Sequence, residues 1–263
     1  MIAIAILLLI CLIYYHPCIS ALYVFIERDL APFFIPPKYL WVGLISSFEA
    51  PLWNPNNYSG IPLLATLQPG IFYPPHILHL FIPFNIAWNW IIILHFIFAG
   101  FTTYLFLRYI NVTKIASFTG GAIFMLSGYM LSIHNLLPHL LAIPWSPLVI
   151  MSFLKYFHTK HKKHLVLTSL FLSMEFLAGA PEIVMMTVLV LFALTIFFDS
   201  FLQGDYKSGS SYNNESAVYR NSTLKSDLLD QTSNRTTVQK AILRFRALLV
   251  AMILFLLITA VQM

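Results

Sequence analysis

Long apolar stretches separated by short polar connections dominate this chain. Segments of about 17 to 25 mostly apolar residues recur, and this is the length that an α-helix needs to cross the hydrocarbon core of a bilayer. The pattern therefore predicts an all-α fold, a polytopic membrane helix bundle with about seven spans. We expect these spans at residues 2–26, 86–108, 115–133, 141–157, 165–181, 182–202 and 242–263.

The segment between the first two spans is partly apolar, but it is not expected to cross the membrane as one straight helix. Residues 33–48 mix apolar side chains with Lys38, a composition that suits a helix lying on the membrane surface. Residues 61–83 are apolar but are interrupted by prolines, which remove backbone donors and clash in helix interiors. A re-entrant or interfacial hairpin is expected there, with its backbone groups satisfied by protein or water.

Residues 203–240 form the one clear break in composition. They are rich in Ser, Asn and Thr and contain too few apolar residues to bury a core, so we expect a disordered cytoplasmic linker. The last span reaches Met263 with no residues after it, which gives the expectation of a truncated chain. The predicted organisation is a first span 1–26, an outer loop 27–85 with interfacial helices, a transmembrane bundle 86–202, the linker 203–240 and a last span 241–263.

Composition agrees with a membrane location. Hydrophobic residues make up 59% of the chain, charged residues only 10%, and the mean hydropathy is +0.79. Soluble domains carry about 25% charged residues, so these values indicate an integral membrane protein.

The placement of the cations predicts the orientation of the chain. Of the 15 Lys and Arg residues, all except Arg28 and Lys38 fall in connections on the same side as the N-terminus. Because cytoplasmic connections carry an excess of Lys and Arg, we expect the N-terminus inside and residues 27–85 outside. The stretch before Glu27 has no basic start, which favours a retained anchor over a cleaved signal peptide. This asymmetry also accounts for the pI of about 9.2, so no nucleic-acid partner is needed.

The first acidic residues, Glu27-Arg28-Asp29, stand directly after the first span. A carboxylate at that place can act as a general base on an acceptor hydroxyl, or it can hold a divalent metal beside a lipid phosphate. Arg28 can bind such a phosphate through two hydrogen bonds. An ordinary charge cluster that flanks a membrane span explains the same residues, so spacing alone leaves both readings and the metal open.

Residues 49–76 are expected to shape the roof of a pocket, with Gln68, Tyr73 and His76 as its polar contacts. The competing interpretation is an aromatic belt, because Trp and Tyr collect at membrane interfaces. His76 and His79 lie three residues apart, but two histidines without a nearby Cys or acid are a weak metal signal. No residue is assigned as a metal ligand.

Four further ionisable residues lie in or beside the spans. His134 and His139 flank a short outer connection and are expected either to line the same cavity as Asp29 or to be solvated loop residues. His95 and Glu175 lie within apolar stretches and need buried partners. We expect structural hydrogen bonds for both rather than an ion path.

Several short motifs follow one another in a specific order. They are Asp29-Leu30, Phe34, Pro51-Leu52-Trp53-Asn54-Pro55, Ser59-Gly60-Ile61-Pro62, Gln68, Phe72-Tyr73-Pro74-Pro75, His95, Ala99-Gly100, Tyr104-Leu105-Phe106-Leu107-Arg108, Phe124-Met125-Leu126-Ser127-Gly128, His139, Pro144-Trp145-Ser146-Pro147-Leu148 and Gly179-Ala180-Pro181-Glu182. This ordered string, which covers most of 27–182, resembles the bacterial YfhO-like membrane proteins. Ala180 departs from it, since a histidine is expected there. Members of that family are also much longer, so the chain resembles an N-terminal half.

The YfhO-like family in turn resembles the C-type glycosyltransferases, polytopic enzymes with an acidic motif in the first outer loop. The resemblance implies a protein of the bacterial cytoplasmic membrane that transfers a sugar from a polyprenyl-phosphate carrier to an envelope polymer or lipid on the outer face. It implies Asp29 as the catalytic carboxylate, with Glu27 completing a Glu-x-Asp pair. Membrane lipids, the lipid-linked sugar and the acceptor are the implied partners.

Two other classes stay open. A non-catalytic fragment or accessory subunit follows from the missing second half. A lipid or sugar transporter is less favoured, because the sequence has no inverted repeats or paired broken helices. No nucleotide-binding glycine loop appears, which disfavours a nucleotide-sugar enzyme.

Overall fold

The computed structural model describes residues 2–19, 22–67, 69–208 and 237–260 of the 263-residue chain, and helices make up most of them. Within these residues the strands are limited to one antiparallel pair of two residues each. The elements are α1 (Ile2–Tyr14), α2 (His16–Ile19), the π-helix η1 (Leu30–Phe34), α3 (Ile35–Ser46), β1 (Trp53–Asn54), β2 (Ile61–Pro62), the 3₁₀ helices η2 (Leu64–Thr66) and η3 (Pro74–Leu80), α4 (Phe84–Tyr109), α5 (Lys114–Met125), α6 (Gly128–Ile133), α7 (Leu137–Ala142), the 3₁₀ helix η4 (Ile143–Trp145), α8 (Ser146–Thr159), α9 (Lys163–Leu177), α10 (Pro181–Ser208) and α12 (Thr237–Thr259).

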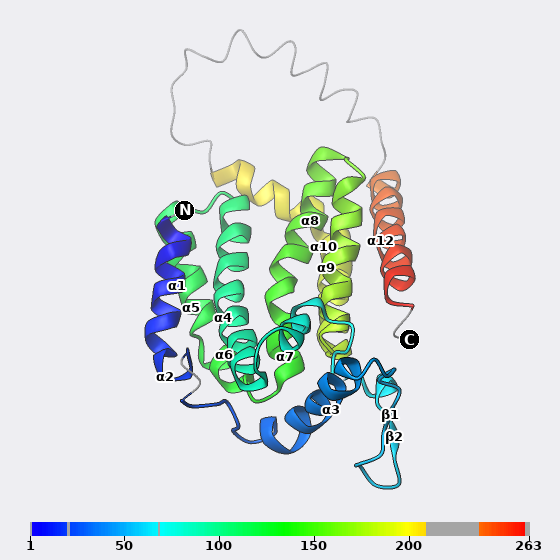
Figure 1. Cartoon of the computed structure of the whole chain (residues 1–263). Helices are drawn as coiled ribbons and strands as arrows, with labels where there is room; N and C mark the ends of the chain where they lie inside the picture. The colour runs from blue at the N-terminus through cyan, green and yellow to red at the C-terminus, as the bar shows by residue number, and fades with distance from the viewer. Residues whose placement is uncertain (1, 20–21, 68, 209–236, 261–263) are drawn as a thin grey trace, which may run out of the picture.

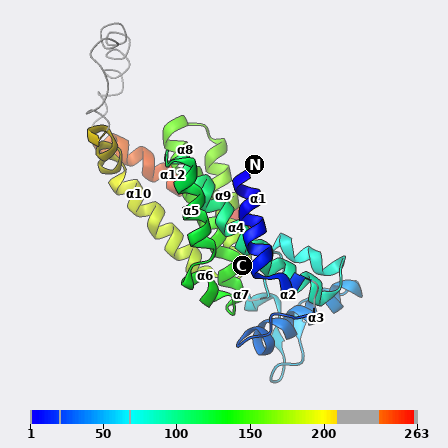
Figure 2. The same cartoon turned by 90° about the vertical axis from the view of Figure 1, so that its left-hand side faces the viewer.

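The long helices run up and down and form a bundle in which sequence neighbours pack side by side (Figure 1). We call the end of the bundle that carries residues 22–83 and α7 the loop end. The opposite end, which carries the connections 110–113 and 160–162, is the basic end. In both views α3 and the β1–β2 hairpin project beyond the bundle at the loop end (Figures 1 and 2).

Prolines and capping side chains mark where the helices begin. Pro83 precedes α4, and Pro181 is the first residue of α10, where the missing N–H of proline costs no helical hydrogen bond. The Ser127 hydroxyl accepts a hydrogen bond from the Met130 amide at 3.2 Å and caps α6. The predicted span 115–133 is therefore broken into α5 and α6 near this serine.

Helices α4 and α5 approach each other closely through glycine. A Cβ atom added to Gly121 would lie 2.6 Å from the Gly100 carbonyl oxygen, which is closer than atoms can pack. Small residues permit such close helix contacts in lipid. The absence of a side chain at Gly121 therefore allows α4 and α5 to lie in close contact.

The hydrophobic interior is divided into three clusters. The first core joins α1, α4, α6 and α7 and is completed by Ala178, Ala180 and Ile183. The second core lies between α8, α9, α10 and α12. A small third cluster, around Trp41, Leu63 and Ile71, packs α3 against residues 61–71. The loop end thus has a hydrophobic cluster of its own.

Four stretches of the described chain are long and apolar enough to cross a membrane, which fits an integral membrane protein. They are Phe84–Tyr109, Lys114–Ile133, Leu137–Thr159 and Ile242–Thr259, and the shorter apolar helices are Ala5–Tyr14 and Pro181–Phe197. The predicted count of seven spans stays a prediction. The middle of the predicted linker, residues 209–236, lies outside the described residues, while helix continues to Ser208 and resumes at Thr237.

Candidate functional site

The acidic segment Glu27-Arg28-Asp29 lies at the loop end, between α2 and η1. Arg28 adopts the left-handed conformation, with a φ of 48°, and so turns the chain sharply between the two carboxylates. The Asp29 carbonyl accepts a hydrogen bond from the Phe33 amide at 3.0 Å, and η1 starts at the next residue. Glu27 and Arg28 are exposed, whereas Asp29 is half-buried.

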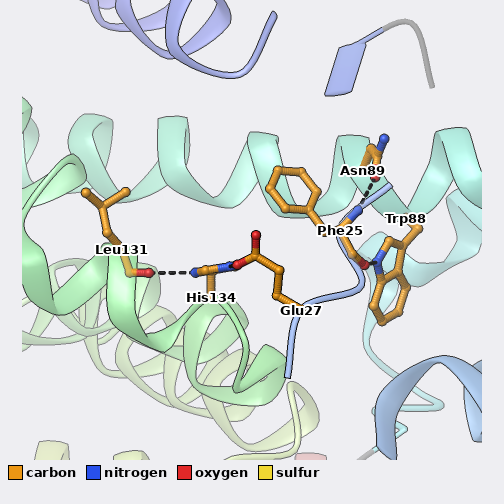
Figure 3. A network of polar contacts seen from close by, with 6 residues as sticks. All are labelled: Phe25, Glu27, Trp88, Asn89, Leu131 and His134. Atoms are coloured by element: carbon orange, nitrogen blue, oxygen red, sulfur yellow. Dashed lines mark hydrogen bonds and ion pairs between the residues drawn. The ribbon is translucent and has the colours of Figure 1, made fainter. Parts of the chain in front are cut away.

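Two side chains of α4 hold the backbone that leads to these residues (Figure 3). The buried Asn89 amide donates to the Tyr23 and Cys18 carbonyls at 2.6 and 2.8 Å, and its oxygen accepts from the Phe25 amide at 3.2 Å. The Trp88 indole donates to the Phe25 carbonyl at 2.8 Å. Buried amide groups need hydrogen-bond partners, and here backbone groups of residues 18–25 supply them. Sequence reasoning missed both residues, because polar side chains at the start of a span resemble ordinary interfacial residues.

Glu27 faces His134 across the site. Its carboxylate oxygen lies 3.2 Å from His134 Nε2, while His134 Nδ1 lies 2.6 Å from the Leu131 carbonyl (Figure 3). Both ring nitrogens face oxygen acceptors, so both contacts are hydrogen bonds when the imidazole carries two protons. Within the described chain, the Asp29 carboxylate makes no side-chain hydrogen bond or ion pair. His134 thus joins the acidic segment and leaves Asp29 unpaired.

His139 lies elsewhere at the loop end. Its Nε2 is 2.8 Å from a carboxylate oxygen of Glu182, at the start of α10. That His139 lines the same cavity as Asp29 stays a prediction. Gln68, the third polar residue expected in the pocket roof, lies outside the described residues.

Tyr73 is buried, with 1% of its surface exposed, and belongs to a polar chain inside the bundle. The Trp145 indole donates to the Tyr73 hydroxyl at 2.8 Å, and that hydroxyl lies 2.7 Å from His95 Nε2. His95 Nδ1 is 2.7 Å from the Ile91 carbonyl. All three polar groups are satisfied when the tyrosine donates to a neutral imidazole. Burial raises the pKa of Tyr73. His95 therefore makes the structural hydrogen bonds expected for it.

His76 contacts Lys38, which sequence reasoning treated only as an outer cation. Lys38 is 1% exposed, and its ammonium group lies 2.6 Å from His76 Nδ1 and contacts the Pro69 carbonyl. His76 Nδ1 also lies 2.9 Å from the Gly70 carbonyl. Gly70 has a φ of +54°, a conformation that L side chains rarely adopt. This glycine turn presents two carbonyl oxygens to the pair.

Burial dominates the electrostatics of these basic groups. Desolvation places the pKa of Lys38 well below its usual value and does the same for His76, with the charge of Lys38 as a smaller cause. Desolvation and the charge of Lys38 also lower the pKa of His79 to about 3. Burial therefore disfavours the protonated form of each of these groups.

Two apolar cavities flank η3. One, of about 570 Å³, is bordered by Trp41, Ile45, Leu52, Leu64, Ile71 and Tyr73, among others. The other, of about 590 Å³, is bordered by Ile77, Leu78, Leu94, His95, Phe98 and Trp145, among others. Apolar lining with a few polar groups at the base suits a hydrocarbon chain whose polar end must be fixed.

Glu175 occupies a separate site between α8, α9 and α10. Its carboxylate accepts from the Ser146 hydroxyl at 2.6 Å and from the Thr187 hydroxyl at 3.2 Å. This is the interhelical hydrogen bonding expected for it. No group of three or more His, Cys, Asp or Glu suited to a metal occurs in the part of the chain that the structure describes.

Comparison with known proteins finds no family model, no curated protein and no solved structure that matches this chain.

Proposed function

We propose that the loop end carries out transfer of a sugar from a polyprenyl-phosphate carrier to an acceptor hydroxyl. The observation that carries this proposal is the half-buried, unpaired Asp29 carboxylate. It follows directly on a backbone segment that Asn89 fixes by hydrogen bonds. A base needs a carboxylate that no other group occupies, and Glu27 meets that condition less well because it pairs with His134. The two apolar cavities beside η3 supply room for a carrier chain.

In this mechanism Asp29 accepts the proton of the acceptor hydroxyl while the oxygen of that hydroxyl attacks the anomeric carbon of the sugar. The bond between that carbon and the phosphate oxygen breaks, and the bonding electrons leave with the polyprenyl phosphate. The proton on Asp29 then passes to water. Arg28, exposed beside both carboxylates, is proposed to neutralise the departing phosphate.

The finer assignments belong to the same proposal. The chain is proposed to be a YfhO-like protein of the bacterial cytoplasmic membrane, with seven spans, the loop end facing outward and an envelope polymer or lipid as acceptor. The described Lys and Arg residues outside the loop end gather toward the basic end, including Arg108, Lys114 and Lys163, which supports this orientation.

The test is Asp29→Asn in the full chain in membranes, with a labelled polyprenyl-phosphate sugar as donor. The variant keeps the shape of the side chain but removes its basicity, so we expect the transfer rate to fall by about 10²- to 10⁴-fold. Glu49→Gln is the matched control, since Glu49 is an exposed carboxylate of the same loop end. It should transfer at the wild-type rate.

Equal rates in wild type and Asp29→Asn would exclude Asp29 as the base. A wild-type chain that inserts but transfers no sugar would favour the alternative of a non-catalytic or accessory membrane protein.

A further inference from the structure

Four buried side chains, three of them basic, form a cluster that borders the first cavity through Trp41. Lys38, Trp41, His76 and His79 are each 5% exposed or less. The His76 ring centroid lies 6.5 Å from that of Trp41 and 6.0 Å from that of His79, and Lys38 Nζ lies 5.3 Å from the Trp41 ring. Trp41 also borders the 570 Å³ cavity. Two elements, α3 and η3, thus bring basic groups to one place.

No acid balances this cluster within the described chain. The two ion pairs there join Glu27 to His134 and Glu182 to His139, and neither involves Lys38. A buried lysine without a carboxylate is unfavourable in its charged form, because burial removes the hydration of the ammonium group. A buried lysine of this kind is a candidate for a functional site, where an anionic ligand would supply the missing negative charge.

The same place contains polar atoms without partners. Trp41 Nε1 and both ring nitrogens of His79 are buried and make no hydrogen bond. The indole can only donate, and a neutral imidazole donates from one nitrogen. A protonated Lys38 has three N–H donors, and the Pro69 carbonyl and His76 accept at most two of them. With Lys38 protonated, the ammonium, the indole and the imidazole each have one donor without an acceptor.

We infer that Lys38, Trp41 and His79 form a subsite for the phosphate group of a lipid phosphate, with the hydrocarbon chain in the cavity beside them. This inference rests on the proposed function and adds buried contacts for the carrier phosphate to the exposed Arg28. A phosphate oxygen accepts hydrogen bonds from the ammonium, indole and imidazole groups together, and its charge compensates that of the lysine. The apolar cavity wall favours a phosphate attached to a chain over free phosphate.

The test uses the purified full chain in nonionic detergent micelles, titrated with dodecyl phosphate, and separately with dodecanol and inorganic phosphate. Dodecyl phosphate should bind saturably, while dodecanol and inorganic phosphate bind much more weakly. Lys38→Met should weaken dodecyl phosphate by about 10- to 100-fold, because a charge-assisted bond is lost. Trp41→Phe, which removes the unpartnered N–H together with part of the buried ring, should weaken it by about 2- to 10-fold.

The controls separate a binding role from a structural one. Lys114→Met removes an exposed cation at the basic end and should bind as the wild type does. Trp41→Phe keeps an aromatic ring in the third cluster and should fold, with a somewhat lower unfolding temperature because part of the buried ring is lost. If Lys38→Met fails to fold, Trp41→Phe and His79→Phe still decide the matter, since each must weaken binding.

The inference is overturned if these variants bind dodecyl phosphate like the wild type, if dodecanol or inorganic phosphate binds as tightly, or if only Arg28→Met loses binding. The sugar-transfer assay separates the two proposals. Transfer that depends on Asp29 together with phosphate binding that ignores Lys38 refutes this inference alone. Phosphate binding through Lys38 in a chain that transfers no sugar refutes the proposed function alone.

Discussion

A single amide, Asn89, fixes three backbone groups of the segment that leads to Glu27, and it does so from within a candidate membrane span. His79 likewise combines a polar group with packing, because its ring stacks on Phe84 with centroids 4.9 Å apart. Side chains of this kind combine packing with a titratable or donating group. Because His79 is titratable, its effect on stability depends on pH.

We predict that acid destabilises the protein partly through His79. Its pKa is about 3 in the folded chain and about 6.5 when unfolded, so the unfolded state binds more protons between these values. Stability should therefore fall as the pH decreases from about 6.5, by up to about 1.4 kcal/mol per pH unit for this group. His79→Phe keeps the stacking and should flatten the decrease. Unfolding temperatures measured between pH 7 and pH 5 provide the check.

The control is His161→Phe, which alters an exposed histidine at the basic end and should leave the pH dependence unchanged. His76, whose pKa is also lowered by burial, acts in the same direction and is retained in both variants. Identical pH dependence in wild type and His79→Phe would contradict the prediction.

The sequence predicted several site residues but not the side chains that contact them. The acidic segment was predicted from its position after an apolar stretch, and that position is local information. The pairing of Glu27 with His134 joins residues 107 apart, Tyr73 is buried in the first core of the bundle, and Lys38 lies on α3, which packs against residues 61–71. No periodic pattern encodes such contacts. Lys38 was therefore counted as an outer cation, although the fold removes it from water.

At the scale of elements, periodicity predicted a mostly helical chain, but several helices differ from the predicted spans. The predicted first span, 2–26, is the helices Ile2–Tyr14 and His16–Ile19, and residues 22–26 are not helical. The predicted span 165–181 is the helix Lys163–Leu177, and a left-handed Gly179 separates it from α10. Residues 61–83 form no straight helix, as their prolines predict. Their packing against the bundle depends on Gly70, where an added Cβ would lie 3.1 Å from the Leu177 carbonyl.

We predict that Gly121→Ala destabilises the pairing of α4 with α5. Its new methyl group would meet the Gly100 carbonyl oxygen at 2.6 Å, and backbone cannot move aside cheaply. Overpacking of this kind costs about 1–3 kcal/mol. Unfolding of the detergent-solubilised chain by heat or denaturant measures the effect.

Gly120→Ala is the matched substitution one residue earlier in the same helix. Its methyl group would meet only the end of the flexible Leu107 side chain, at 2.5 Å, and alanine favours helix by about 1 kcal/mol over glycine. We expect stability equal to or above that of the wild type. Equal losses in both variants would show that the contact with Gly100 is not the cause.

At the scale of the whole molecule, charge separates the two ends of the bundle. The loop end contains Arg28 and Lys38, of which Lys38 is buried, whereas connection 160–162 alone carries two lysines. A distribution of this kind governs insertion rather than folding. The helices would pack equally well in either orientation, so the structure and the orientation are separate questions.

We predict that the loop end faces away from the cytoplasm. Cysteines introduced at Ser59, in the exposed hairpin turn, and at Lys162, in the connection between α8 and α9, test this with an impermeant thiol reagent. The Ser59 position should be labelled in intact cells and the Lys162 position only after lysis. The wild-type chain, with Cys11 and Cys18, gives the background. The reverse labelling pattern would refute the orientation.

The division of the interior into separate cores has a consequence in time. Apart from three residues, the first core ends at Ile143, whereas Ala178, Ala180 and Ile183, which complete it, belong to the α9–α10 region. At a synthesis rate of about 5–20 residues per second, Ile183 is added about 2–8 s after Ile143. During that interval α1, α4 and α7 can assemble around the acidic segment while one side of their core is still uncovered. The elements that hold Asp29 are thus made before the residues that close the core around them.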